Sequence, residues 1–121
     1  MKRAVVTGAT GMLAIALTNL LVSEGMDVIA VIRPGSSRAG NVPQSDNVTV
    51  VELDMENIGD LPVVLRASGV DKADLFFHFA WDGTHGDSRN DMDIQIKNVS
   101  CSVEAVRAAA ALGCEAFLGA G

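Results

Sequence analysis

The sequence contains no tyrosine and few other aromatic residues, so its core must be built from smaller side chains. Aromatic residues make up 4% of the 121 residues, whereas hydrophobic residues make up 49%. Alanine, valine, leucine and glycine dominate, which is typical of a parallel sheet that helices cover on both faces. This length allows one domain with one core, residues 1–121, and the apolar content argues against disorder.

The sequence also lacks any run of lysine or arginine, and its formal net charge is -6. A protein of this kind has no basic footprint for nucleic acid or for an anionic membrane, so we expect neither partner. The longest uninterrupted apolar run, Met12 to Leu17, is far short of the ~20 residues that span a bilayer. Because polar residues and glycines soon follow Met1-Lys2-Arg3, we expect no signal peptide and a cytoplasmic location.

Cysteine is scarce, and the potential metal ligands show no recognisable spacing. Cys101 and Cys114 are the only cysteines and form no C-x-x-C pattern, so we expect free, buried or half-buried thiols. His78 and His85 lie near Asp82 and Asp87, but no ligand-spacing rule links these four residues. We therefore expect neither a metal site nor a disulfide.

The most informative stretch that is present runs from Ala4 to Gly25, AVVTGATGMLAIALTNLLVSEG. It predicts a strand, a phosphate-binding turn and a helix. Gly8 lets the chain reverse at the strand end and Gly11 lets the backbone approach a pyrophosphate, while Ala14 needs only to be small for close helix–strand contact. The unpaired amides and positive dipole end of the helix N-terminus would then face the glycines and attract a phosphate.

The alternative is an ordinary strand-to-helix turn with no ligand. The β-rich strand before the glycines and a second strand, Asp27–Ile32, complete a βαβ unit, which favours nucleotide binding.

Helical periodicity predicts which faces of two helices turn toward the sheet. The first helix carries a stripe of apolar residues at helical spacing, namely Leu13, Ala16, Leu17, Leu20 and Leu21. A long helix over Asp91–Leu112, ended by Gly113, carries another, namely Val99, Val103, Val106 and Ala110.

The second strand is followed by a basic residue, at a place where NAD-specific dinucleotide-binding units usually have an acidic one. A unit that binds the cofactor without a 2'-phosphate usually has an acid there to bond the ribose. Here Arg33 follows Ile32, and a guanidinium suits a 2'-phosphate, with help from Ser36, Ser37 or Arg38. The pattern favours NADP as the cofactor. The alternative is that Arg33 is a solvated residue with no ligand. The loop that it opens, residues 33–47, has room for one helical turn.

The remaining elements complete a Rossmann-type, doubly wound parallel sheet of five strands in the order 3-2-1-4-5. Further strands are predicted at Val48–Leu53, Asp74–Ala80 and Glu115–Ala120, with a short helix at Leu61–Ser68. Asp54 would then lie at the same carboxyl edge as Gly8, or alternatively cap the next segment. Trp81, which opens a polar loop to Ser88, would form a wall of the binding cleft.

Four ordered motifs carry a family resemblance over nearly the whole chain. Thr7-Gly8-Ala9-Thr10-Gly11-Met12-Leu13-Ala14 matches a T-G-x-x-G-x-x-G turn, with alanine in the last place. Leu53-Asp54-Met55 resembles a motif that contacts adenine. Phe77-His78-Phe79-Ala80 is similar to an H-x-A-A strand end beside the nicotinamide ribose, with Trp81 replacing the second alanine, and Asn98-Val99 matches an asparagine that helps to organise the active site. The chain thus resembles the extended short-chain dehydrogenase/reductases, in their NAD-dependent epimerase/dehydratase group.

The resemblance implies an NAD(P)-dependent enzyme that acts on a nucleotide sugar. Because no later helix or strand of this sequence would cover the fifth strand and its neighbours, we also expect association through that uncovered region, as a homo-oligomer. Asn98 would be a supporting residue of catalysis. The implied cofactor-binding residues are Thr7, Gly8, Thr10, Gly11, Met12, Leu13, Arg33, Arg38, Asp54, Met55, Ala80, Trp81 and Asn98.

One departure from the family matters for activity. The family uses a serine or threonine after the fifth strand and a Tyr-x-x-x-Lys on the next helix, in which the lysine lowers the pKa of the tyrosine. The sequence stops at Gly121 and has no tyrosine, so we expect the amino-terminal part of a longer enzyme, inactive alone. The alternative is a non-catalytic, NADP-binding redox sensor, and a Tyr-x-x-x-Lys in the parent reading frame would distinguish the two.

Overall fold

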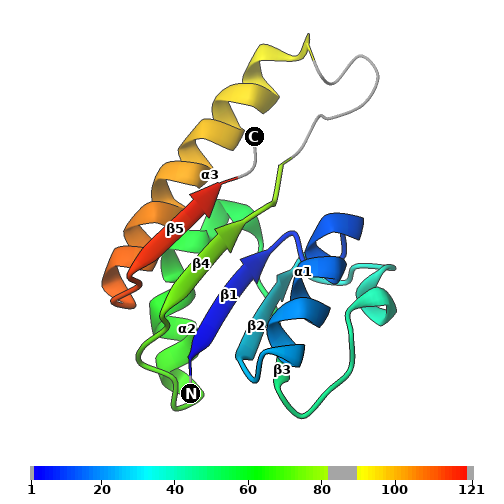
Figure 1. The fold of residues 1–121 in the computed structure, drawn as a ribbon. Coiled ribbons are helices and arrows are strands. Elements are labelled where there is room, and N and C mark those ends of the chain that lie inside the picture. The colour runs from blue at the N-terminus through cyan, green and yellow to red at the C-terminus, as the bar shows by residue number, and fades with distance from the viewer. Residues whose placement is uncertain (1, 82–89, 120–121) are drawn as a thin grey trace.

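The structure, a computed structural model, describes residues 2–81 and 90–119 and contains one parallel sheet (Figure 1). The strands are β1 (Arg3–Thr7), β2 (Asp27–Ile32), β3 (Val48–Glu52), β4 (Leu75–His78) and β5 (Ala116–Gly119). The α-helices are α1 (Met12–Ser23), α2 (Leu61–Ala67) and α3 (Met92–Ala111), and the 3₁₀ helices are η1 (Ala39–Asn41) and η2 (Met55–Asp60). The strand order is β3-β2-β1-β4-β5, which confirms the predicted Rossmann-type topology.

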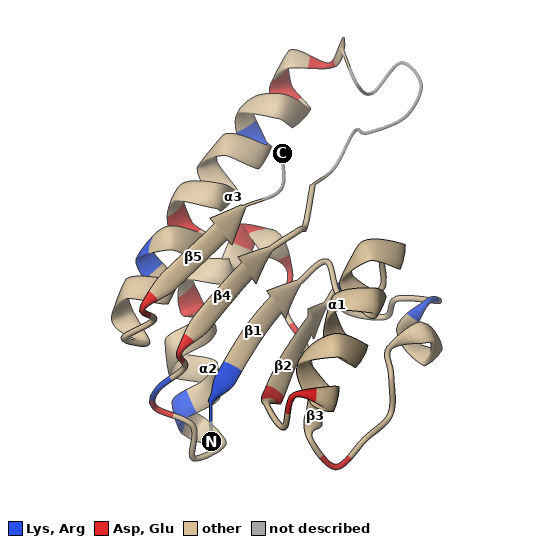
Figure 2. Ribbon diagram, viewed as in Figure 1, with Lys and Arg blue, Asp and Glu red and all other residues tan. Residues whose placement is uncertain are grey.

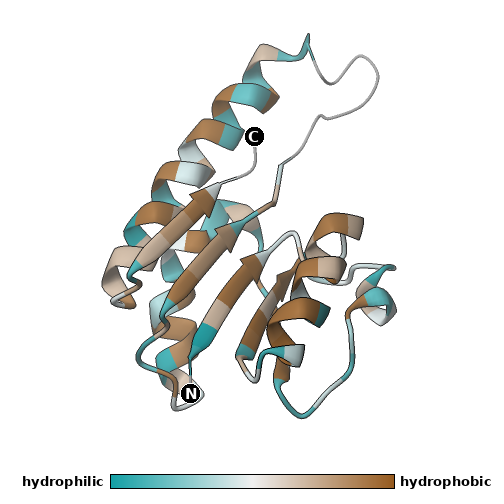
Figure 3. Cartoon of the chain, in the orientation of Figure 1, coloured by the Kyte–Doolittle hydropathy of each residue, from teal (hydrophilic) through white to brown (hydrophobic). Residues whose placement is uncertain are grey.

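Helices lie on both faces of the sheet, with α1 on one side and α2 and α3 on the other (Figure 1). Alternation along β1 separates two cores, because successive side chains point to opposite faces. Val5 belongs to the core under α2 and α3, whereas Ala4 and Val6 belong to the core under α1. The central strands are brown in Figure 3, as expected for strands buried on both faces.

The prediction of the buried face was wrong for much of α1. Leu21 is buried and Leu17 packs against the core, but Leu13 and Leu20 are 64% and 56% exposed. Ala14 is buried against the sheet, as its predicted close helix–strand contact requires, and Thr18, which was not predicted to be buried, lies on the same side. Apolar residues fill nearly every early position of this helix, so periodicity alone allows several faces, and the smallest side chains give the closest approach to the sheet.

The prediction that the valine stripe of α3 faces the sheet was also wrong, because small side chains again give the closest approach to the sheet. The helix buries Asn98 and a set of alanines, namely Ala105, Ala108 and Ala109. Val99, Val103 and Val106, together with Ala110, lie on the exposed side.

Smaller differences concern the ends of elements. β4 stops at His78 rather than at Ala80, and η2 fills a segment that the sequence left without structure. The helical turn allowed in the loop 33–47 is present as η1. The predicted polar loop and the last residues of the fifth strand fall partly on residues 82–89 and 120–121, outside the described residues.

The exposed side of α3 carries an apolar seam with the spacing of a coiled coil. Its residues are Met92, Ile96, Val99, Val103, Val106 and Ala110, at alternating intervals of four and three. This period of 3.5 suits packing against another helix. Gln95, Ser100 and Ser102 border the seam without charge, whereas Asp93 and Arg107, the latter paired with Glu104 at 2.7 Å, border it nearer its two ends, so the middle of the seam carries no charge that would repel a second copy.

We therefore expect the chain to self-associate through α3 as a weak, concentration-dependent dimer. Val103→Lys should weaken association by about tenfold or more, because the dimer would bury an unpaired charge. Sedimentation equilibrium measures this, and Val63→Lys, on the exposed side of α2, is the matched control. A chain that stays monomeric at high concentration, or equal weakening by both variants, would contradict the expectation.

Candidate functional site

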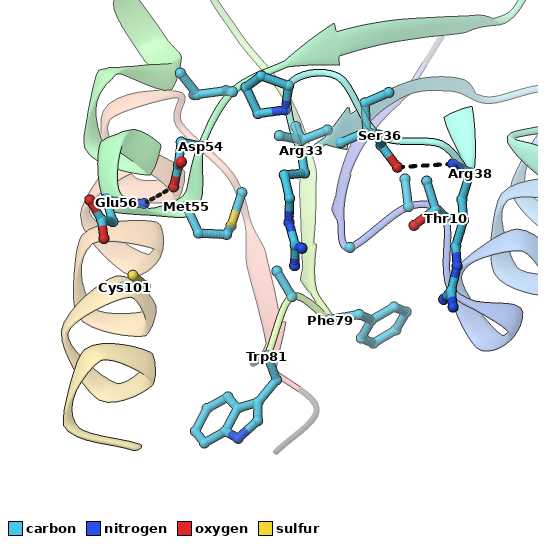
Figure 4. Close-up of a pocket in the computed structure, with 18 of the residues that line it drawn as sticks. Thr10, Arg33, Ser36, Arg38, Asp54, Met55, Glu56, Phe79, Trp81 and Cys101 are labelled. Carbon is cyan, nitrogen blue, oxygen red and sulfur yellow. Dashed lines mark hydrogen bonds between the residues drawn. The ribbon is translucent and has the colours of Figure 1, made fainter. Parts of the chain in front are cut away.

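A cleft of about 880 Å³ opens where the carboxyl ends of the strands meet (Figure 4). Ligands of open α/β sheets bind at this edge, where the strand order reverses beside β1. Its walls come from the turn after β1, the loop after β2, the start of η2, the residues after β4 and one side of α3. The volume lies within the range of small-molecule and cofactor sites, roughly 300–1,000 Å³.

The turn after β1 is built around a contact that only glycine allows. Gly8 has a φ of 63°, and a Cβ placed there would lie 2.8 Å from the backbone nitrogen of Ala80. Gly11 is the N-cap of α1, and its amide donates to the carbonyl oxygen of Gly8 at 3.1 Å. No side chain caps the first turn of α1, so its amides and positive dipole end are left for another partner, the arrangement that favours an anion at a helix N-terminus.

Thr7 lies buried behind this turn and joins β1 to the end of β4. Its Oγ1 accepts from the amides of Phe79 and Ala80 at 3.1 and 3.2 Å and lies 2.8 Å from Nδ1 of His78. These bonds explain why β4 ends at His78, since the next two amides turn to a side chain. Burial lowers the pKa of His78, which favours its neutral form.

The loop after β2 brings two arginines to the cleft. Figure 4 shows the side chains of Arg33 and Arg38 extending into it. The hydrogen bonds that hold the loop include one from the Gly35 amide to Glu52 at 3.1 Å and one from the Arg38 amide to the Ser36 hydroxyl at 3.2 Å. Elsewhere, Figure 2 shows blue segments near the N-terminus, at the opposite end of the sheet from the cleft, and others on α3.

Asp54 has both of the roles considered for it from the sequence. It lines the cleft at the end of β3, and its Oδ1 accepts the Glu56 amide at 3.1 Å as the N-cap of η2. Glu56 also pairs with Lys97 of α3, and this hydrogen bond raises the pKa of Lys97. The pair joins η2 to α3 at the rim of the cleft. Nothing in the sequence indicated it, because the two residues meet only in the folded chain.

Gln95 organises the far end of the cleft and was not predicted. Its Oε1 accepts from the indole Nε1 of Trp81 at 3.1 Å and from Nδ2 of Asn98 at 3.2 Å. Gln95 therefore fixes Trp81, which the family resemblance places beside the nicotinamide ribose, and Asn98, which it makes an organising residue of the active site. The indole is held against α3 at the mouth of the cleft.

A model of the NAD dependent epimerase/dehydratase family matches residues 4–121, which include most of β1 and every later element. The chain belongs to this family. The comparison with curated proteins gives no match.

Solved structures of two epimerases and of one further enzyme share the fold. Epimerase Mth375 from Methanothermobacter thermautotrophicus is 25% identical, with a TM-score of 0.77 over 98% of this chain and 34% of its own. WbmH of Bordetella bronchiseptica, solved with NAD+, is 23% identical, with a TM-score of 0.73 over 97% and 38%. UDP-glucose-4-epimerase from Stenotrophomonas maltophila, solved with NAD and formylated UDP-arabinopyranose, is 19% identical, with a TM-score of 0.79 over 98% and 36%. The chain thus spans a little over a third of the length of these proteins.

Most of the residues predicted for the site of this epimerase/dehydratase chain line the cleft. These are Gly8, Thr10, Gly11, Arg33, Arg38, Asp54, Met55, Ala80, Trp81 and Asn98. Thr7 lies behind the lining, and Met12 and Leu13 lie outside it, 89% and 64% exposed. Lys97 and Cys101 line the cleft without having been predicted, because only the folding of α3 over the sheet brings them there.

Neither thiol is in a disulfide, as predicted, and both are half-buried. Burial raises the pKa of the Cys114 thiol.

Within residues 2–81 and 90–119, no three histidine, cysteine, aspartate or glutamate side chains gather as metal ligands would. His85, Asp82 and Asp87 lie outside the described residues. No helix of the described part has both the length and the apolarity needed to cross a membrane.

The contact at Gly8 can be tested with a matched pair of glycines. Gly8→Ala introduces a Cβ at a positive φ and against the Ala80 backbone, whereas Gly25→Ala, at a φ of 80°, meets nothing within 4 Å. Both variants should lose about 1–2 kcal/mol of unfolding free energy from backbone strain. Gly8→Ala should lose a further ~1–3 kcal/mol from overpacking. Urea unfolding measures both, and equal losses would contradict the close approach.

Proposed function

We propose that the chain is the NAD(P)-binding part of an epimerase/dehydratase-family oxidoreductase that acts on a nucleotide sugar. The single observation that carries this proposal is the cleft in which the Gly8–Gly11 turn and the uncapped start of α1 face the ends of β2 and β4. An elongated ligand with a central pyrophosphate fits such a cleft, because the anion site lies between two walls of different chemistry.

Each wall suits one end of a dinucleotide. Arg33, Asp54 and Met55 offer charge, a hydrogen-bond acceptor and an apolar surface at the proposed adenosine end. Ala80, Trp81 and Asn98 form the proposed nicotinamide end, held by Gln95 and by the Thr7 hydroxyl. A bound nicotinamide supplies reversible hydride transfer. The residues described here would bind and orient the cofactor, while the acid/base group and the sugar site are proposed for the complete protein.

Family membership and the bound sugar nucleotide in the Stenotrophomonas epimerase support the proposed substrate class. A non-catalytic NADP-binding redox sensor is the alternative, because the glycine turn and Arg33 would look the same in such a protein. A Tyr-x-x-x-Lys in the parent reading frame would favour the enzyme. The cytoplasmic location and the lack of turnover by this chain alone stay predictions.

Dinucleotide binding through Gly11 is tested by Gly11→Val. Its φ of -75° is open to any residue, so the variant should fold, but its side chain would obstruct the approach of a pyrophosphate. We expect affinity for NADP to fall by at least about tenfold, or 1.4 kcal/mol, in titration calorimetry. Gly40→Val, in η1 and away from the cleft lining, is the control. Equal affinity of Gly11→Val and the unmutated chain would refute this binding mode.

A preference for NADP over NAD is proposed from Arg33. A guanidinium can form charge-assisted hydrogen bonds to a 2'-phosphate, worth about 1.5–3 kcal/mol each. Arg33→Ala should therefore erase the difference between the two cofactors, whereas Arg66→Ala, exposed on α2, should leave it unchanged. Titration calorimetry with both cofactors measures this. If the unmutated chain binds NAD as tightly as NADP, the role given to Arg33 is wrong.

A further inference from the structure

The hydroxyl of Thr7 has a fully determined set of hydrogen bonds. A threonine hydroxyl donates one proton and accepts through two lone pairs. The amides of Phe79 and Ala80, at 3.1 and 3.2 Å, can act only as donors, and they occupy both lone pairs. The hydroxyl proton must then go to the remaining neighbour, Nδ1 of His78, at 2.8 Å.

This assignment also decides the state of the His78 ring. If Nδ1 accepts from Thr7, the ring is neutral and carries its proton on Nε2. Among the described residues, Nε2 is the one buried side-chain nitrogen or oxygen without a hydrogen-bond partner. The side chain is 2% exposed, so the proton on Nε2 points into the interior and not to solvent.

We propose that His78 is a positioning residue for the glycine turn, because its neutral Nδ1 takes the Thr7 hydroxyl proton and leaves the hydroxyl oxygen to hold the Phe79 and Ala80 amides. Phe79 and Ala80 line the cleft, and their backbone lies directly against Gly8. A Cβ placed on Gly8 would be 2.8 Å from the backbone nitrogen of Ala80. The geometry of the turn therefore depends on which ring nitrogen of His78 carries the proton. That this turn holds a pyrophosphate rests on the proposed function.

Acid should break this arrangement. A proton on Nδ1 would make His78 a third donor toward an oxygen that has two lone pairs, so one amide bond would be lost. The His78 ring lies against two uncharged groups, the hydroxyl of Thr7 on β1 and the ring of Phe117 on β5. The centroids of the His78 and Phe117 rings are 6.1 Å apart. On α3, the residues buried toward the sheet do not titrate, and the half-buried titratable ones are Cys101 and Glu104. Because burial lowers the pKa of His78, the acid step should lie below the ordinary value of 6.5.

Two substitutions separate positioning from mere packing. In His78→Asn, the side-chain oxygen can take the place of Nδ1 as an acceptor but cannot be protonated. In His78→Leu, the Thr7 hydroxyl loses its acceptor. His85→Asn, which removes the other histidine of the sequence, is the control. Two readouts apply to each chain: amide hydrogen exchange of Phe79 and Ala80 without cofactor, and affinity for NAD, which has no phosphate monoester that titrates near pH 6, both between pH 7.5 and pH values around and below 6.

The unmutated chain and His85→Asn should show a loss of protection and of affinity in acid by about threefold to tenfold, the effect of one hydrogen bond. His78→Asn should match them at neutral pH but lack the acid step, and His78→Leu should be weaker throughout without a step. Nitrogen-15 spectra of the imidazole should show the proton on Nε2 at neutral pH.

A proton on Nδ1, the absence of an acid step, or an asparagine variant that behaves like the leucine variant would overturn the inference. If protection of the two amides follows the expected pattern but the unmutated chain binds no dinucleotide at neutral pH, the proposed function fails and the positioning role of His78 stands.

Discussion

The architecture depends on how closely the turn after β1 approaches its neighbours. β1 lies between β2 and β4, so the turn at its end meets both strands at once. On one side the Ala9 amide donates to the Val31 carbonyl oxygen at 3.3 Å, and on the other Gly8 lies against the Ala80 backbone. A side chain at Gly8 would separate the turn from β4. The start of α1 and both walls of the cleft take their positions from this one close approach.

The strand order was predictable because its determinants are local. Two glycines after a β-rich run, followed by a helix and another buried strand, allow few arrangements once crossovers are right-handed. The buried faces of α1 and α3 were not predictable by counting apolar residues. Both helices meet the sheet through small side chains such as Ala14 and Ala105 and leave larger ones, Leu20 and Val103, exposed. The glycine motif did predict the close contact of Ala14, but no motif marks Ala105, and counting apolar residues does not show which side of a helix approaches the sheet most closely.

The residues of the site also fall into those that the sequence could predict and those that it could not. Residues that belong to short motifs, such as Gly11, Asp54 and Ala80, could be placed at one sheet edge from their order in the chain. Gln95 and the Glu56–Lys97 pair could not, because their roles arise where η2, the end of β4 and α3 come together in space. The length of β4 escaped prediction for a related reason. A side chain on β1, Thr7, captures the amides that would have continued the strand.

The indole of Trp81 has a consequence that goes beyond its place in the wall. It is the only tryptophan in a sequence without tyrosine, so the near-ultraviolet emission of the chain comes almost wholly from one ring. That ring lines the cleft and is anchored to α3 through Gln95. A ligand that enters the cleft, or a shift of α3 relative to β4, would therefore alter the fluorescence spectrum at a single, known location. The protein carries its own optical probe of the cleft and needs no attached label.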